Sequence, residues 1–370
     1  MSESIYQGKI EWKESEKKMK DKQVRMLAIA SSVLCLGAII IFFVCSKGEF
    51  VNISVQASTT NTYVGADLYE QFETIADEKR EELEEELKKY LRIELPENTK
   101  ESDIDIEVSY IKQTMSIRIK NKDSSYMKTN PTVGSCNHIA DLNYYRDKQE
   151  GCIDIQLDSV YEYESSIQEN QLVIKFLNPR ELYDHIIVVD AGHGGGHPGT
   201  NRNGILEKDL TLQMVTYAKE LFDADENIRV YYTRLDDSNP SFDERVQMAN
   251  KLKADYFLSV HINSNEESRE PNGTEVLYYT EDNRSKEFAQ ICADEESKAL
   301  NSRNRGITTG DTIYIIRNSK VPVALIEVGF ISNNNEFGLL CSKSYQKKAA
   351  QGMYQAIISA YEKDGITWEK

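Results

Sequence analysis

The sequence lacks several signatures that would place it in familiar classes of protein. It contains no Cys-x-x-Cys, no His-Glu-x-x-His and no Gly-x-Ser-x-Gly. These absences argue against a structural zinc site closed by cysteines, a zincin peptidase and an esterase with a nucleophile elbow. Positive charge is also scarce, because 44 Lys and Arg stand against 61 Asp and Glu and the net charge is −17. This balance argues against a nucleic-acid-binding protein.

A glycine-rich loop at residues 192–199 carries two histidines. It lacks the third glycine of a dinucleotide-binding fingerprint. It also looks like the oxyanion loop of some esterases, but the chain offers no nucleophile elbow to work with it. The loop follows Ile186–Val189, a run of four apolar residues that is typical of a strand buried on both faces. We therefore expect the loop at the carboxyl end of a buried strand, where sites form in α/β sheets.

Residues 26–45 form a long apolar run without a charged residue. Since about 20 such residues span a bilayer as a helix, the run predicts one transmembrane helix. Basic residues gather before the run and only Lys47 follows it closely; those before it are Lys17, Lys18, Lys20, Lys22 and Arg25. The positive-inside rule then predicts a single-pass protein of the cell membrane, with residues 1–25 in the cytoplasm and the rest outside. A cleaved signal peptide is the alternative, but the run is long for one and the nearest small-residue site, at 54–57, lies too far beyond it.

Residues 46–180 are expected to form a small extracytoplasmic α+β module. Apolar residues at helical spacing predict a helix over 66–91, and alternating patterns predict strands at 104–110, 115–119, 153–157 and 172–176. The module shows no cluster of potential ligands or nucleophiles, so the sequence assigns it no role. Its Cys136 and Cys152 either form a disulfide, which an oxidising exterior permits, or remain free thiols.

From residue 184 to residue 370, predicted strands alternate with predicted helices. The strands are expected at 186–190, 229–233, 256–261, 276–279, 313–316 and 324–328. The helices are expected at 208–222, 242–252, 286–300 and 345–361. This alternation predicts an α/β domain with a largely parallel open sheet and helices on both of its faces.

Three of these strands end on side chains that bind metals or carry protons. The strands end on or next to His193, His261 and Glu327. Glu207 and Asp209 open the helix between the first two strands and could point to the same place. Any one histidine at a strand end is more often held by backbone carbonyls. Two histidines and two carboxylates at one edge of a sheet instead indicate a site.

Two imidazoles and one carboxylate bind zinc in the pattern of catalytic sites, which leave one position open for water. Zinc held in this way lowers the pKa of its water and polarises a carbonyl oxygen. Glu327 would then serve as the general base and would later protonate the leaving amine. The residues themselves therefore indicate metal-assisted hydrolysis of an amide, with the choice between Glu207 and Asp209 left open.

Four motifs in this order resemble the zinc-dependent N-acetylmuramoyl-L-alanine amidases of bacterial cell-wall metabolism, the amidase_3 type. The motifs are VVDAGHGG at 188–195, EKDL at 207–210, Arg245-x-x-x-Ala-Asn250 together with ADYFLSVHINS at 254–264, and LIEVGFISN at 325–333 followed by Glu336. The resemblance covers about residues 184–363. It implies a zinc ion bound by His193, Glu207 and His261, and Glu327 as the catalytic acid and base. It further implies hydrolysis of the amide bond between N-acetylmuramic acid and L-alanine in peptidoglycan.

The same motifs suggest that Arg245 and Asn263 contact the substrate. Two departures from the family stand out. His197 occupies a position where many relatives have aspartate, and we expect it to replace a hydrogen bond of the loop rather than to bind the metal. The long inhibitory helix of some division amidases also has no room between residues 279 and 313. Control would then come from elsewhere, such as a regulatory protein partner or the module at 50–180.

Three functions remain to be separated. The first is a membrane-tethered, outward-facing zinc amidase that remodels the cell wall. The second is a non-catalytic wall-binding protein, which is disfavoured because all three ligands and Glu327 are present. The third is a zinc peptidase of the stem peptide, which differs from the first only in the bond that it breaks.

Overall fold

The computed structural model describes residues 90–120, 136–147 and 150–367. The predicted cytoplasmic tail, the predicted transmembrane helix at 26–45 and most of the predicted helix at 66–91 lie outside these ranges. Within them, no helix is both long enough and apolar enough to cross a membrane. The chain divides into two compact units, Met1–Leu68 and Tyr69–Lys370, and all described residues belong to the second.

Two antiparallel sheets make up the described part of the N-terminal module, in the strand orders β1–β7–β6 and β2–β3–β5–β4. The strands are β1 Tyr90–Glu94, β2 Ile104–Ser109, β3 Thr114–Lys120, β4 Ile139–Asp147, β5 Glu150–Leu157, β6 Glu162–Gln168 and β7 Gln171–Leu177. Apolar side chains from both sheets share one core. The four predicted strands are thus confirmed. The last two residues of the predicted helix, Tyr90 and Leu91, instead begin β1, because Leu91 and Ile93 alternate with polar neighbours.

A six-stranded sheet forms the centre of the C-terminal domain, in the order β11–β8–β12–β15–β13–β14. Its strands are β8 Ile186–Ala191, β11 Arg229–Tyr232, β12 Tyr256–Asn263, β13 Thr274–Tyr278, β14 Asn304–Thr309 and β15 Val323–Phe330. All neighbours run parallel except β13 and β15, which are antiparallel. The predicted largely parallel sheet is therefore confirmed.

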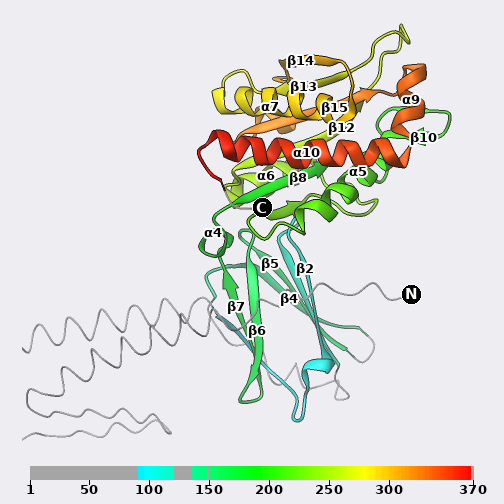
Figure 1. Ribbon diagram of the computed structural model, residues 1–370. Helices are drawn as coiled ribbons and strands as arrows, with labels where there is room; N and C mark the ends of the chain where they lie inside the picture. The colour runs from blue at the N-terminus through cyan, green and yellow to red at the C-terminus, as the bar shows by residue number, and fades with distance from the viewer. Residues whose placement is uncertain (1–89, 121–135, 148–149, 368–370) are drawn as a thin grey trace, which may run out of the picture. The chain divides into compact units, whose positions relative to one another are not determined.

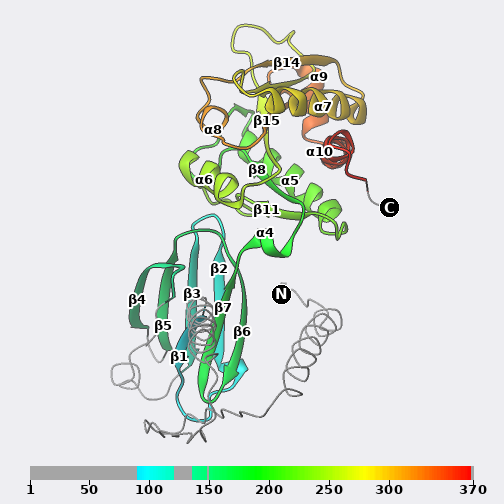
Figure 2. The same cartoon turned by 90° about the vertical axis from the view of Figure 1, so that its left-hand side faces the viewer.

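Helices cover both faces of this sheet (Figures 1 and 2). One face packs against α5 Glu207–Phe222, α7 Asn283–Leu300 and α10 Lys343–Lys363. The other face packs against α6 Phe242–Leu252 and the short α8 Tyr314–Arg317. The remaining short elements are α4 Pro179–Leu182, β9 Asn201–Arg202, β10 Ile205–Leu206 and α9 Asn334–Leu340. Because α6 and α8 are short, they cover only part of their face.

The predicted strand at 313–316 is wrong. These residues belong to α8 and its N-cap, and the strand is formed earlier, by β14. Ile315 and Ile316 are buried, so the apolar run reports burial correctly but is too short to distinguish a strand from one turn of helix. The sequence of β14, Asn304-Arg-Gly-Ile-Thr-Thr309, carries a weak apolar signal because the strand lies at the edge of the sheet.

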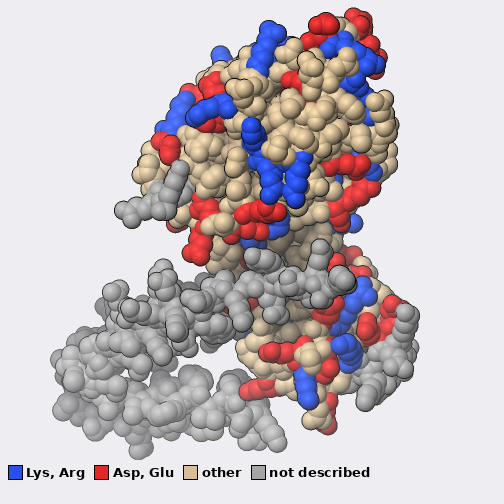
Figure 3. Space-filling model, turned by 45° about the vertical axis from the view of Figure 1, so that its right-hand side comes forward, with Lys and Arg blue, Asp and Glu red and all other residues tan. Residues whose placement is uncertain are grey.

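The surface of the described residues carries mixed charge. On the face that Figure 3 presents, Lys and Arg side chains form one small group and elsewhere alternate with Asp and Glu. That face offers no broad basic surface for a nucleic acid backbone, in keeping with the net charge of −17.

Candidate active site

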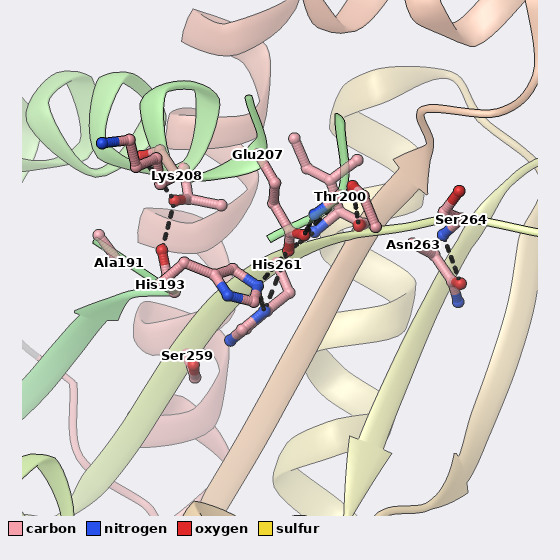
Figure 4. A network of polar contacts seen from close by, with 12 residues as sticks. Ala191, His193, Thr200, Glu207, Lys208, Ser259, His261, Asn263 and Ser264 are labelled. Atoms are coloured by element: carbon pink, nitrogen blue, oxygen red, sulfur yellow. Dashed lines mark hydrogen bonds and ion pairs between the residues drawn. The ribbon is translucent and has the colours of Figure 1, made fainter. Parts of the chain in front are cut away.

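Three potential metal ligands converge at the carboxyl ends of neighbouring strands (Figure 4). His193 follows β8, His261 lies near the end of β12, and Glu207 is the first residue of α5. His193 Nε2 lies 3.0 Å from Glu207 Oε1, and His261 Nδ1 lies 3.1 Å from both of these atoms. Bonds of 2.0–2.2 Å to one zinc ion would separate tetrahedral ligand atoms by about 3.4 Å, so the observed triangle fits a metal with little movement.

Backbone and hydroxyl donors fix the orientation of Glu207. Its Oε2 accepts a hydrogen bond from the Thr200 backbone N–H (2.8 Å), and its Oε1 accepts one from the Ile262 N–H (2.9 Å). Burial alone would raise the pKa of Glu207, but the hydrogen bonds and charges of the two histidines outweigh it and hold the pKa well below its usual range. Asp209, the alternative from the sequence, is exposed and lies outside this group.

Two glycines of the loop are required by the site itself. A Cβ atom at Gly199 would lie 2.4 Å from Glu207 Oε2 and 2.7 Å from His193 Cδ2. A Cβ atom at Gly192 would lie 2.5 Å from the His261 ring. His193 itself has φ of +65°, a left-handed conformation that is costly for a residue with a side chain. The loop therefore accepts backbone strain in order to aim His193 at the other two ligands.

Glu327 lies beside His261, because these two residues are paired in register between β12 and β15. Its Oε2 is buried and has no hydrogen-bond partner among the described residues. Burial, followed by the negative charges of Glu207 and Glu275, raises the pKa of Glu327 to about 8. A carboxyl group with such a pKa exchanges its proton near neutral pH, as a general acid or base must.

Comparison with known proteins agrees with this geometry. Residues 187–359 match the family described as Amidase_3, N-acetylmuramoyl-L-alanine amidase. The amidase CwlM of Bacillus licheniformis is 31% identical to the chain, and the matched region covers 47% of this chain and 68% of CwlM. The uncharacterized protein YqiI of Bacillus subtilis is 34% identical, over 48% of this chain and 84% of YqiI.

The chain belongs to the N-acetylmuramoyl-L-alanine amidase family. A crystal structure of such an amidase from Clostridium difficile 630 is 30% identical, with a TM-score of 0.46, over 48% of this chain and 97% of that one. The chain is accordingly a hydrolase that acts on the amide bond between N-acetylmuramic acid and L-alanine. Its first 180 residues lie outside the region that the family covers.

Arg245 of the amidase domain is not placed to contact substrate, contrary to the prediction. The side chain is only 2% exposed, and it donates to Asp190, to the Ala191 and His193 carbonyls and to the Pro240 carbonyl. Four of its five N–H donors are thus used within the protein. Arg245 is therefore a positioning residue that holds the backbone of the metal loop.

Asp190, which the sequence analysis did not single out, is the centre of this buried network. It accepts from the hydroxyls of Thr233 and Ser259 as well as from Arg245. Burial would raise its pKa, but these partners outweigh that effect and lower it. The Asp190 carboxylate is therefore charged, and it ties three strands and α6 together beneath the metal loop. In the sequence, Asp190 is marked only by its place as a polar residue directly after the apolar run Ile186–Val189.

Asn263 and His197 have different surroundings. Asn263 lies at the end of β12, is partly exposed, and accepts a hydrogen bond from the Ser264 N–H at its Oδ1. His197 is exposed and pairs through its backbone with Gly194, by hydrogen bonds of 2.9 and 3.0 Å. His197 is not part of the ligand group. The described cysteines Cys136, Cys152, Cys292 and Cys341 are all free thiols, so the structure agrees with the second of the two alternatives for Cys136 and Cys152.

Proposed function

We propose that the protein is a zinc-dependent N-acetylmuramoyl-L-alanine amidase that is tethered to the cell membrane and remodels peptidoglycan outside it. One observation carries the proposal: two imidazole nitrogens and one carboxylate oxygen converge within 3.1 Å, beside a buried Glu327 oxygen that has no hydrogen-bond partner in the described part of the chain. A set of two histidines and one glutamate is typical of catalytic zinc sites. The Glu327 oxygen would accept a hydrogen bond from the attacking water.

His193, Glu207 and His261 are the residues that would hold the zinc ion. When bound, zinc supplies a Lewis acid and a water of lowered pKa. Glu327 would take a proton from the attacking water and deliver it to the nitrogen of the leaving L-alanine. Burial, and then the charges of Glu207 and Glu275, raise the pKa of Glu327 in the metal-free site. Asn263, partly exposed at the same strand end, is positioned to hydrogen-bond the substrate.

The site of action follows from the predicted anchor. The apolar run at 26–45 and the basic residues before it predict an outward-facing catalytic domain, and peptidoglycan lies on that side of the membrane. The residues between the anchor and the amidase domain would then span the distance to the wall. Between β13 and β14 the chain forms one helix, α7, which packs on the sheet, and there is no additional inhibitory helix there. A regulatory partner would therefore act on the segment before the amidase domain or on the amidase surface.

The test is digestion of purified peptidoglycan by the detergent-solubilised full chain, with identification of each new amino terminus. We expect new L-alanine termini, which disappear when a chelator removes the metal and return when zinc is added. The Glu327→Gln variant should bind zinc stoichiometrically and cleave nothing. Undiminished cleavage by this variant would refute the assigned role of Glu327.

The same digestion separates the alternatives. A new terminus within the stem peptide would identify a peptidase. Zinc binding without any cleavage, in the wild-type chain, would identify a wall-binding protein that keeps the fold.

A further inference from the structure

The catalytic side chains share one face of the sheet with the core under α6 and α8. Side chains two positions apart on a strand point to the same side. Leu325 lies two residues before Glu327, and Leu277 lies two residues after Glu275, so each of these leucines points to the same face as its glutamate. Both leucines pack in the core that α6 and α8 cover. His261 is paired with Glu327 in register and belongs to the same face. The site is therefore the part of this face that α6 and α8 leave open.

Two aromatic rings lie where the two helices begin. Phe242 is the first residue of α6 and Tyr314 is the first residue of α8. The rings are stacked, with centroids 6.2 Å apart and planes inclined by 27°. Phe242 is 66% exposed and Tyr314 is 37% exposed. The Tyr314 hydroxyl donates to Asp243 Oδ1 (3.3 Å), which holds the pair together.

Phe242 is exposed although it belongs to the sheet-facing stripe of its helix. The buried residues Arg245, Val246 and Ala249 follow it at the spacings i+3, i+4 and i+7, which define one side of a helix. Its ring nevertheless lies outside the core that these residues form with the sheet. Single exposed apolar side chains are ordinary, but two stacked rings from separate helices form a flat surface that needs another explanation.

This surface adjoins the metal loop. Arg245, one helical turn after Phe242, donates to the His193 carbonyl (2.7 Å). The segment before α6 also packs on the glycine loop, since the Gly195 N–H donates to Asp237. The aromatic pair thus flanks the open face on which His261 and Glu327 lie.

The substrate supplies a matching group. The scissile amide is attached to muramic acid, so sugar rings of the glycan strand must extend from the site when the bond is in place. A sugar ring offers a face of C–H groups, which packs on the electron-rich face of an aromatic ring, and hydroxyls that can donate to a carboxylate such as Asp243. The stem peptide, which carries carboxylates, would be repelled by Asp243.

We propose that Phe242 and Tyr314 form a platform that binds a sugar ring of the glycan strand beside the cleaved muramic acid. The proposal rests on the amidase function and makes the platform a determinant of preference for polymeric substrate. The enzyme would then favour intact glycan strands over released muropeptides.

The test compares two substrates, purified glycan strands with their stem peptides and a minimal N-acetylmuramoyl-L-alanyl peptide without neighbouring sugars. The variant is Phe242→Ala/Tyr314→Ala, and Leu182→Ala, another exposed apolar residue (40%) in α4, is the matched control. We expect the ratio of kcat/KM on strands to kcat/KM on the minimal substrate to fall about tenfold in the double variant, mainly through KM. The ratio should be unchanged in Leu182→Ala and should stay close to the wild-type ratio in the conservative variant Phe242→Tyr, which keeps an aromatic ring.

A second measurement does not depend on turnover. Glu327→Gln protein should bind peptide-free glycan strands, and the two alanine substitutions added to it should weaken that binding by a similar factor. An equal loss on both substrates would show a structural role for the pair and overturn the proposal, as would an unchanged ratio. Failure of the wild-type protein to release L-alanine termini from either substrate would instead refute the amidase function.

Discussion

The loop that carries His193 shows how single residues decide whether the metal can bind. Gly199 has φ of +69°, and a Cβ atom there would press on both Glu207 and His193. We expect Gly199→Ala to weaken zinc binding by about tenfold to a hundredfold and activity with it. Gly196→Ala is the matched control, since no atom lies within 4 Å of the added Cβ and φ is not positive. Equal zinc affinity of the two variants, measured by competition with a chelating dye, would contradict this account.

The buried acid Glu327 links stability to pH. Its pKa of about 8 exceeds its ordinary value of 4.5, so the folded protein binds its proton more tightly than the unfolded chain does. The resulting stabilisation is complete below pH 4.5 and is lost as the pH rises towards 8. We expect metal-free Glu327→Gln to lack this loss and to gain stability over the wild type across that window, by an amount of the order of a few kcal/mol.

Urea unfolding at pH values from 4.5 to 8, with chelator present, checks the expectation. Glu275→Gln serves as a graded control, because it removes one of the charges that raise the pKa of Glu327. The free energy of unfolding should then fall less steeply with pH than in the wild type, but it should still fall. Parallel stability curves for wild type and Glu327→Gln would show that Glu327 ionises normally.

At the scale of elements, the Asp190 network joins β8, β11, β12 and α6 through a buried ion pair with Arg245. Removing only the Arg245 cation leaves the Asp190 carboxylate buried without a counter-charge, so Arg245→Met should destabilise the protein by about 3–5 kcal/mol. Asp190→Asn/Arg245→Met removes both charges and should recover part of that loss. The free energy of unfolding by denaturant is to be compared for the wild type, Arg245→Met and the double variant. A double variant no more stable than Arg245→Met would argue against a charge effect.

The sequence predicts the elements whose burial leaves a strong pattern. β8, β12 and β15 are central strands with long apolar runs, and His193, His261 and Glu327 lie after or within their carboxyl halves, so the sequence predicts both the strands and the site. The sequence does not predict β14, which lies at the sheet edge, and it predicts a strand where α8 forms, because four apolar residues fit either period.

Tertiary packing decides what the sequence leaves open at the site. Arg245 resembles a substrate-binding residue in a motif, but only the fold reveals that its guanidinium donates to Asp190 and to three backbone carbonyls. Glu275 likewise appears as one polar residue of an alternating strand. Its pairing with Glu327 across β13 and β15 becomes visible only when the antiparallel register is known.

On the scale of the whole molecule, the N-terminal module contacts the amidase domain away from the metal site. Glu162 of β6 accepts hydrogen bonds from Arg229 and Tyr231 of β11, and Tyr110 donates to it as well. Arg229 begins β11 and pairs with Ile186 at the start of β8, so these contacts lie at the amino ends of the strands. None of these contacts involves the carboxyl ends of the strands, where the metal ligands lie.

The predicted membrane topology places the amidase domain outside the cell, and one thiol offers a direct test. Cys341 is a free and exposed thiol of this domain, whereas Cys152 and Cys292 are buried. In a variant that keeps Cys341 as its only cysteine, a membrane-impermeant maleimide should label the chain on intact protoplasts, and Cys341→Ser should abolish the signal. Replacing the basic residues before the apolar run by glutamate should reduce outside labelling, because those residues set the orientation. Labelling that requires a permeabilised membrane would place the domain in the cytoplasm, where no peptidoglycan is available to it, and would overturn the proposed site of action while leaving the chemistry of the site intact.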